Sequence, residues 1–167
     1  ASFYLLRKDR QSTVEELQRG VRLAKDLAER GHADGMCLYG IMLTDGIFYD
    51  GDDGRLTLIL EPNPQNAAVW FQRCVELHPS HGQSWYELAV AVFTGEGVVS
   101  NETLAVKYFA KASDLGHAGA AFMLGDCLLD GVGVERDRAE ALEWFIVAGE
   151  LGHRGAKDRV MAVLNHD

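Results

Sequence analysis

Apolar residues recur at helical spacing along most of the chain. Ala105, Tyr108, Phe109 and Ala112 stand at positions i, i+3, i+4 and i+7, which places them on one face of a helix. The same stripe returns in two other segments: Ala67, Trp70, Phe71 and Cys74, and Ala141, Trp144, Phe145 and Ala148. The pattern predicts amphipathic helices that each bury one aromatic and alanine-rich face.

Polar residues and glycines mark where these helices start and stop. Thr13 and Asp137 are each followed three residues later by a glutamate, the spacing of a capping box. The pair Asn63-Pro64 offers an N-cap followed by proline at the first helical position. Gly116 and its equivalents Gly31 and Gly152 are suited to the left-handed conformation that ends a helix. We expect eight helices, near residues 13–30, 33–45, 64–77, 82–94, 101–115, 118–130, 138–151 and 154–164.

These segments repeat at a nearly constant step. Phe109 precedes Phe145 by 36 residues, and Gly116-His117 precedes Gly152-His153 by the same step. Phe71 lies 38 residues before Phe109, so the turn around Pro79 carries two extra residues. A more diverged copy at residues 21–46 matches the third copy at a shift of 85. Tandem copies of this kind stack and share a continuous interior.

The second helix of each copy is apolar on more than one side and must be covered by neighbours. Gly40, Ala89 and Gly125 occupy one equivalent position within it. A small residue there predicts that two helices approach closely.

The repeated residues resemble the Sel-1-like repeat family, a relative of the tetratricopeptide repeats. The resemblance rests on the aromatic pair and alanine of the first helix, the LGHAGA turn at residues 115–120, the Leu124-Gly125 pair, and the exit at residues 131–134 with Asp137. It covers roughly residues 14–160. It implies an all-α fold, a right-handed superhelical solenoid of about four helix-turn-helix repeats. The expected division is an N-terminal arm at 1–12 and a repeat solenoid at 13–167, with units at 13–46, 63–98, 101–134 and 137–164.

An insert interrupts the second copy. Gly46 lies 24 residues before Trp70, whereas Gly131 lies only 13 residues before Trp144. The insert contains an acidic turn at residues 50–54 and a β-favouring run at 56–60, which predict a loop or small hairpin near residues 47–62. Insertions in solenoids often project from the binding face. The insert positions expected to contact a partner are Phe48, Tyr49, Asp52 and Asp53.

Composition limits the classes of partner. Hydrophobic residues make up 47% and charged residues 25% of the chain, which is typical of a globular protein rather than a disordered one. The net charge of -9 disfavours nucleic acid as a partner. No apolar run reaches the roughly 18 residues of a transmembrane helix, so we expect no direct membrane insertion. Three cysteines without a CxxC motif favour a reducing intracellular compartment, the cytosol or an organelle interior.

Histidines are the first candidates for chemistry. His32, His117 and His153 recur at one repeat position, but stacked copies would hold them apart, so we interpret them as turn residues that bond local backbone. Cys74, His78 and His81 form a loose cluster without a fourth ligand. Cys74 also belongs to the buried stripe, so a zinc site is not expected.

The acidic turn and the tryptophans are the remaining candidates. Asp50, Asp52 and Asp53 resemble the start of a calcium loop, but the closing glutamate is missing. Trp70 and Trp144 occupy a repeat position and are expected in the core. We find no nucleotide-binding loop and no Ser/His/Asp arrangement, and we expect no catalytic residue, metal or cofactor.

The expected function is therefore a non-enzymatic protein-protein interaction scaffold or a structural subunit of a larger multiprotein complex. Two alternatives stay open: a substrate-recruiting adaptor for protein quality control, and a metal-dependent enzyme or regulatory domain that uses the histidine turn or the acidic insert. In related repeats the first helices line the concave wall. The predicted contact positions on these helices are Gln72, Arg73 and Glu76, then Lys107, Lys111 and Asp114, then Glu143, Val147 and Glu150.

Overall fold

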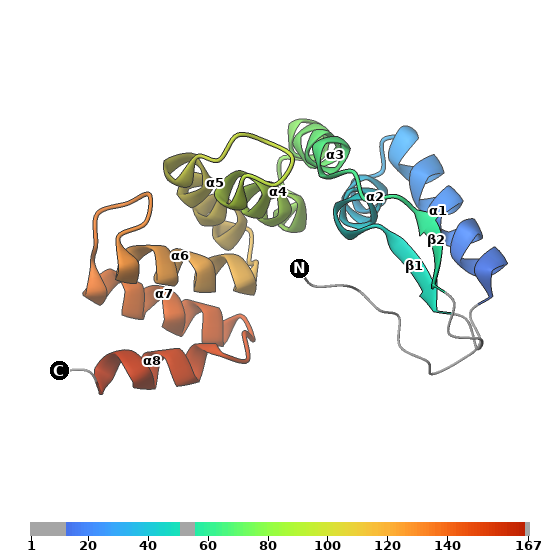
Figure 1. The fold of residues 1–167 in the computed structure, drawn as a ribbon. Coiled ribbons are helices and arrows are strands. Elements are labelled where there is room, and N and C mark those ends of the chain that lie inside the picture. The colour runs from blue at the N-terminus through green and yellow to red at the C-terminus, as the bar shows by residue number, and fades with distance from the viewer. Residues whose placement is uncertain (1–12, 51–55, 166–167) are drawn as a thin grey trace. The chain divides into compact units, whose positions relative to one another are not determined.

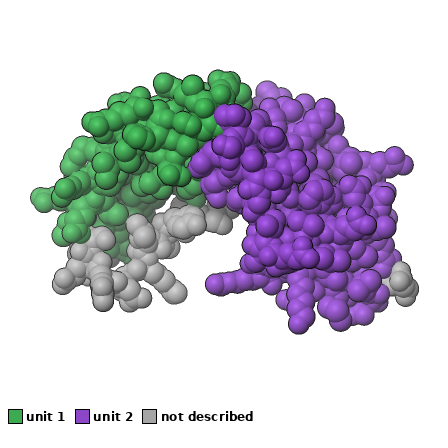
Figure 2. Space-filling model, turned by 180° about the vertical axis from the view of Figure 1, so that it is seen from behind, with its two compact units in different colours: residues 1–78 green, residues 79–167 purple. Residues whose placement is uncertain are grey.

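A computed structural model describes residues 13–50 and 56–165, which form eight helices and two strands (Figure 1). The chain divides into two compact units, residues 1–78 and 79–167 (Figure 2). Unit 1 contains α1 (Val14–Glu29), α2 (Ala33–Asp45), β1 (Ile47–Asp50), β2 (Leu56–Leu60) and α3 (Pro64–Leu77). Unit 2 contains α4 (Gly82–Thr94), α5 (Glu102–Asp114), α6 (Ala118–Asp130), α7 (Arg138–Glu150) and α8 (Ala156–Leu164). The expected helical fold with a small hairpin is confirmed, whereas the predicted arm at 1–12 lies outside the described residues.

The helix starts follow from the capping residues. Thr13 forms a complete capping box, because its hydroxyl accepts from the Glu16 amide at 3.3 Å and its own amide donates to the Glu16 carboxylate at 2.8 Å. Asn63 accepts from the Asn66 amide at 3.0 Å. Asp137 makes only half of the expected box. Its carboxylate accepts from the Glu140 amide at 2.9 Å, while the Glu140 carboxylate accepts from the indole of Trp144 at 3.3 Å.

In unit 1, α2 packs against both α1 and α3. The ring of Phe71 is buried against the backbone of Gly40, where an added Cβ would lie 2.5 Å from a ring carbon. The close approach predicted at this small residue is therefore confirmed. The imidazole of His78, at the end of α3, lies 2.7 Å from the carbonyl oxygen of Gly31 and so ties α3 to the turn between α1 and α2.

The insert forms an antiparallel pair, β1 with β2. Phe48 pairs with Leu58, and Tyr49 pairs with Thr57; an irregularity interrupts the register between residues 47 and 48. β2 lies beside α1, but Leu58 and the preceding residues of this strand stay exposed. The hairpin therefore covers only part of its own apolar surface.

In unit 2, successive helices pack in the order α4, α5, α6, α7, α8. Phe109 and Phe145 are fully buried, and Phe71, their equivalent in unit 1, is almost as completely buried. An added Cβ at Gly125 would lie 2.7 Å from the ring of Phe145, and Ala89, at the equivalent position in α4, is fully buried. The repeated phenylalanine and its small partner therefore build the core in both units.

The turns also follow the prediction, whereas two tryptophans differ from it. Gly116 has a φ of +84°, in the left-handed region that ends a helix, and Gly31 and Gly152 behave alike. Trp70 and Trp144 are half-buried rather than buried. Trp144 packs against the alanines that join α6, α7 and α8, but its indole nitrogen reaches the surface to meet Glu140. A tryptophan is large enough to contribute packing while one edge stays in solvent.

Candidate interaction surface

The predicted contact residues of unit 1 lie on the outer side of α3. Gln72, Arg73 and Glu76 are all exposed. The Gln72 amide donates to the Glu76 carboxylate at 2.7 Å, and the Arg73 guanidinium lies 5.4 Å from the centre of the Trp70 ring. The half-buried indole and its arginine thus form one amphipathic patch, in which a cation-π contact holds the guanidinium at the surface.

In unit 2, five of the six predicted positions are exposed: Lys107, Lys111 and Asp114 on α5, and Glu143 and Glu150 on α7. None of these five forms an ion pair within residues 13–50 and 56–165. Val147 differs, because it is half-buried and packs against the cluster formed by Ala121, Ala148 and Ala156. Its side chain contributes to the packing of α7 as well as to the surface.

Only two of the four predicted contact residues of the insert, Phe48 and Tyr49, lie in the described part of the hairpin. Phe48 and Tyr49 are half-buried on β1, so their rings are partly available. Asp52 and Asp53 lie outside the described residues. The predicted contact role of the insert stays a prediction.

The recurring histidine is a turn residue, and its best-formed example is His117 at the start of α6. Its Nδ1 accepts from the Ala120 amide at 3.1 Å, and its Nε2 lies 3.0 Å from the side-chain oxygen of Gln83, which assigns the proton to Nε2. The imidazole stacks on Tyr86 with 4.2 Å between ring centres. Burial lowers the pKa of His117 below its ordinary value of 6.5 and raises the pKa of Tyr86, to which the charge of Glu87 adds.

The other copies of this turn vary. His153 stacks on Phe122 at 4.1 Å, one repeat step after the His117 and Tyr86 pair. His32 is exposed and makes no capping bond. His81 caps α4 by accepting from the Ser84 amide at 3.2 Å, although the sequence interpretation left it out of the set. The 36-residue step back from His117 would have found it.

The residues of the loose zinc-like cluster serve different contacts. The Cys74 thiol lies 3.5 Å from the carbonyl oxygen of Ala33, His78 faces Gly31, and His81 caps α4. Over the described parts of the chain, no group of three or more His, Cys, Asp or Glu side chains is placed to hold a metal ion.

The three cysteines are buried, and none forms a disulfide. Burial, followed by the charges of Asp126, Asp130 and Glu102, raises the pKa of Cys127 to about 11. Its thiol is therefore protonated at neutral pH and behaves as a small apolar side chain.

A known protein family matches this chain over three consecutive segments. The family described as Sel1 repeat matches residues 33–77, 84–117 and 118–153, which together span more than half of the chain. The chain belongs to the Sel1 repeat family. Each matched segment of this Sel1 repeat chain joins a second helix to the next first helix: α2 to α3, α4 to α5, and α6 to α7. No curated protein matches the chain.

Solved structures show the same fold at low sequence identity. A Sel1 repeat protein from Oxalobacter formigenes has a TM-score of 0.70 at 22% identity, over 92% of this chain and 60% of that protein. A protective antigen of uropathogenic Escherichia coli, described as displaying an SLR fold, has a TM-score of 0.74 at 22% identity, over 90% of this chain and 29% of that protein. Cysteine rich protein B of Helicobacter pylori has a TM-score of 0.63 at 20% identity, over 89% of this chain and 97% of that protein.

These likenesses establish an all-α repeat fold of the solenoid type. The chain spans less than two thirds of the Oxalobacter and Escherichia proteins. Sel1 repeat proteins are typically protein-protein interaction scaffolds rather than enzymes. In the described part of this chain, every helix is too short or too polar to cross a bilayer.

Proposed function

We propose that this chain is a non-enzymatic scaffold that binds another protein through the outer sides of α3, α5 and α7, as a structural subunit of a larger assembly. In this proposal the three helices open the repeat units at 63–98, 101–134 and 137–164. The proposed contact residues are the exposed members of the predicted set on each helix, together with Phe48 and Tyr49 of the hairpin in unit 1.

One observation carries the proposal most directly. Along α5, Ala105, Phe109 and Ala112 are fully buried, while Lys107 and Lys111 on the same helix are exposed. Packing within the unit uses one face of this helix and leaves the other face, with its charges, in solvent. The two lysines take no part in the packing of the helix, so their ammonium groups are available to contact a partner.

The charges on these helices favour a partner with both signs of charge. α5 presents two ammonium groups, Lys107 and Lys111, and α7 presents two carboxylates, Glu143 and Glu150. Complementary charges would set the orientation of the partner and speed the encounter more than they add to affinity. The net charge of -9 favours a partner that is basic overall.

Affinity purification of the full chain with its bound partners tests the proposal. Lys107→Glu with Lys111→Glu should lower recovery of the partner by at least about tenfold, because two attractive contacts become repulsive. Lys157→Glu, an exposed lysine on α8, is the matched control and should leave recovery unchanged. Equal recovery in all three proteins would contradict the proposed surface.

The ratio of chain to partner separates the two modes of binding. A structural subunit returns the same partners at fixed ratios in repeated preparations. An adaptor that recruits substrates for protein quality control returns varied partners at low ratios, which would replace the subunit interpretation.

A further inference from the structure

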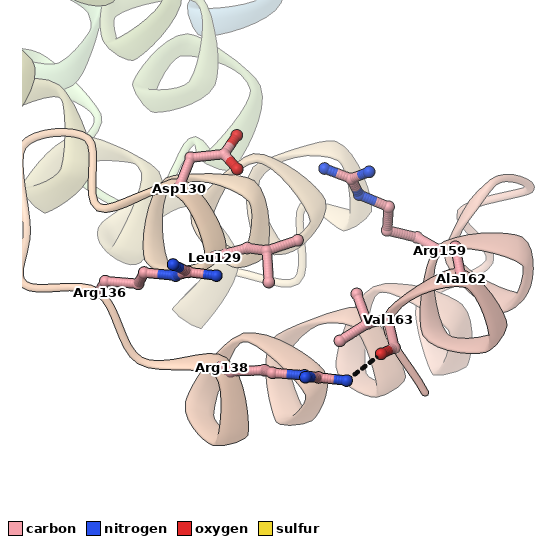
Figure 3. A pocket seen from close by; sticks show the side chains of 7 residues that line it. All are labelled: Leu129, Asp130, Arg136, Arg138, Arg159, Ala162 and Val163. Carbon is pink, nitrogen blue, oxygen red and sulfur yellow. Dashed lines mark hydrogen bonds between the residues drawn. The ribbon is translucent and has the colours of Figure 1, made fainter. Parts of the chain in front are cut away.

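A cavity of about 410 Å³ opens in unit 2 between the end of α6, the loop that follows it, the start of α7, and α8 (Figure 3). Three guanidinium groups line it, from Arg136, Arg138 and Arg159, together with one carboxylate, Asp130. Apolar side chains, among them Leu129 and Val163, complete the wall. Figure 3 shows the three arginines on different sides of the same space.

Two of these arginines are held in place by the fold. Arg159 pairs with the carboxylate of Asp126 at 2.7 Å and lies over the ring of Phe145. Arg138, the first residue of α7, donates to the carbonyl oxygen of Val163 in α8. Their guanidinium groups are therefore ordered before any ligand arrives, which lowers the entropy cost of binding.

Arg136 differs from the other two. It is exposed, and it forms no hydrogen bond or ion pair with any residue in the described ranges. It lies in the loop that joins α6 to α7, so its side chain can turn toward a ligand without breaking a contact of the fold.

The repeat itself does not demand these arginines. One 36-residue step earlier, the equivalent positions are Ser100, Glu102 and Met123, with no guanidinium among them. The contrast is sharpest at the first residue of the helix. The positive end of a helix dipole favours an acidic residue there, as with Glu102 in α5, yet α7 begins with an arginine.

We propose that this cavity binds a carboxylate of a partner protein, with Arg136 as the group that closes on it and Arg138 as the fixed donor. A guanidinium matches a carboxylate with two parallel hydrogen bonds, and Leu129 and Val163 suit an apolar side chain next to it. Asp130 and the Asp126 partner of Arg159 favour a single negative charge over a doubly charged phosphate. This inference rests on the proposed function, because it assumes that the ligand is part of a protein.

Titration of the full ¹⁵N-labelled chain with three short peptides tests the site by NMR. The first is acetylated Gly-Ser-Ala-Leu with a free carboxylate, the second is its C-terminal amide, and the third is an amide in which glutamate replaces serine. Saturable shifts at residues around Arg136 and α8 are expected with a carboxylate-bearing peptide and not with the neutral amide. Binding of the first peptide alone identifies a chain terminus as the ligand, and binding of the third identifies an acidic side chain.

Arg136→Gln should weaken this binding by at least about fivefold, because it removes one charged hydrogen-bonding partner. Arg154→Gln, an exposed arginine in the same unit, is the matched control and should bind as the natural chain does. Equal binding of the neutral amide, or unchanged binding by Arg136→Gln, would overturn the site.

The outcome separates this site from the proposed function. If no peptide binds while charge reversal on α5 still removes the partner, the carboxylate site fails and the scaffold proposal stands. If the peptides bind as expected but charge reversal on α5 has no effect, the contact row fails and the carboxylate site stands.

Discussion

In both units a phenylalanine ring packs against a glycine of the neighbouring helix. The turns that precede α2 in unit 1 and α6 in unit 2 differ. In unit 1 the ring of Phe71 lies against Gly40, and in unit 2 the ring of Phe145 lies against Gly125. The histidine turns diverge, because His117 caps α6 and stacks on Tyr86, whereas His32 is exposed and makes no capping bond. In unit 1 the bond from His78 to Gly31 holds the turn instead.

The difference shows which parts of the repeat are exchangeable. The phenylalanine ring that packs on a glycine cannot be removed without leaving a cavity, and no hydrogen bond elsewhere would fill that space. A capping bond contributes only about 1 kcal/mol and can be replaced by another contact to the same turn. We therefore expect substitutions to affect the two units alike at the phenylalanines and unlike at the histidines.

The largest effect is expected at the shared phenylalanine. Phe71→Ala and Phe145→Ala should each lower the free energy of unfolding by about 3 to 5 kcal/mol, because each leaves a cavity in a fully packed interior. Urea denaturation followed by tryptophan fluorescence measures both, with Trp70 reporting on unit 1 and Trp85 and Trp144 reporting on unit 2. Val69→Ala, at an exposed position of α3, is the control and should change little. A small loss at one phenylalanine only would break the equivalence of the two units.

The glycine under the ring comes next. Gly125→Ala should destabilise the chain by about 1 to 3 kcal/mol although alanine is the better helix former, because its Cβ would collide with the Phe145 ring. Gly20→Ala in α1 meets nothing within 4 Å and should instead stabilise the chain, by about 0.5 to 1 kcal/mol. Thermal unfolding of the two variants should therefore shift in opposite directions. Shifts in the same direction would mean that helix propensity outweighs the close approach.

The histidine turns should separate the units. His117→Ala should cost about 1 kcal/mol or slightly more, because it removes both the cap of α6 and the contact with Tyr86. His32→Ala should leave stability nearly unchanged. His117→Asn keeps a capping side chain and should recover most of the loss. Denaturation midpoints of the three variants, measured at pH 7.5, decide the comparison; equal losses at His117 and His32 would refute it.

The smallest effect is a dependence on pH. Burial lowers the pKa of His117 in the folded chain below the 6.5 of the unfolded chain, so the unfolded state binds the proton more tightly. The stabilisation is fully present above pH 6.5 and is lost as the pH falls from there through the lowered pKa. His117→Asn should show a shallower loss of stability between pH 7.5 and 5.5 than the natural chain. The same slope in both proteins would assign the acid sensitivity to other groups.

Local features of the sequence were sufficient to predict the helices. Apolar spacing and capping residues placed every helix within two residues of its observed bounds, because both signals act within one or two turns of the chain. The 36-residue step also predicted that Phe109 and Phe145 share one buried setting, since equivalent residues of stacked copies meet equivalent neighbours. The β-favouring run at residues 56–60 predicted the hairpin.

The local sequence pattern could not predict contacts between residues that are far apart in the chain. Val147 has the spacing of an exposed residue, but α8 and its neighbours cover part of it. His32 and His117 occupy the same repeat position, but the ring that stacks on His117 belongs to the preceding copy of the repeat, where Tyr86 lies in α4. Among the described residues no copy precedes the one that contains His32.

The sequence by itself determined the helical repeat, its helix ends and the phenylalanine that each copy buries, because periodicity and capping are properties of neighbouring residues. Only the tertiary structure decided which surface side chains remain open and which arginines meet. Arg136, Arg138 and Arg159 come from a loop and two helices, and they line one cavity only after α8 has packed beside α7. The proposed binding sites combine residues that are distant in the sequence, so they are formed by the packing of the helices and cannot be predicted from the local sequence pattern.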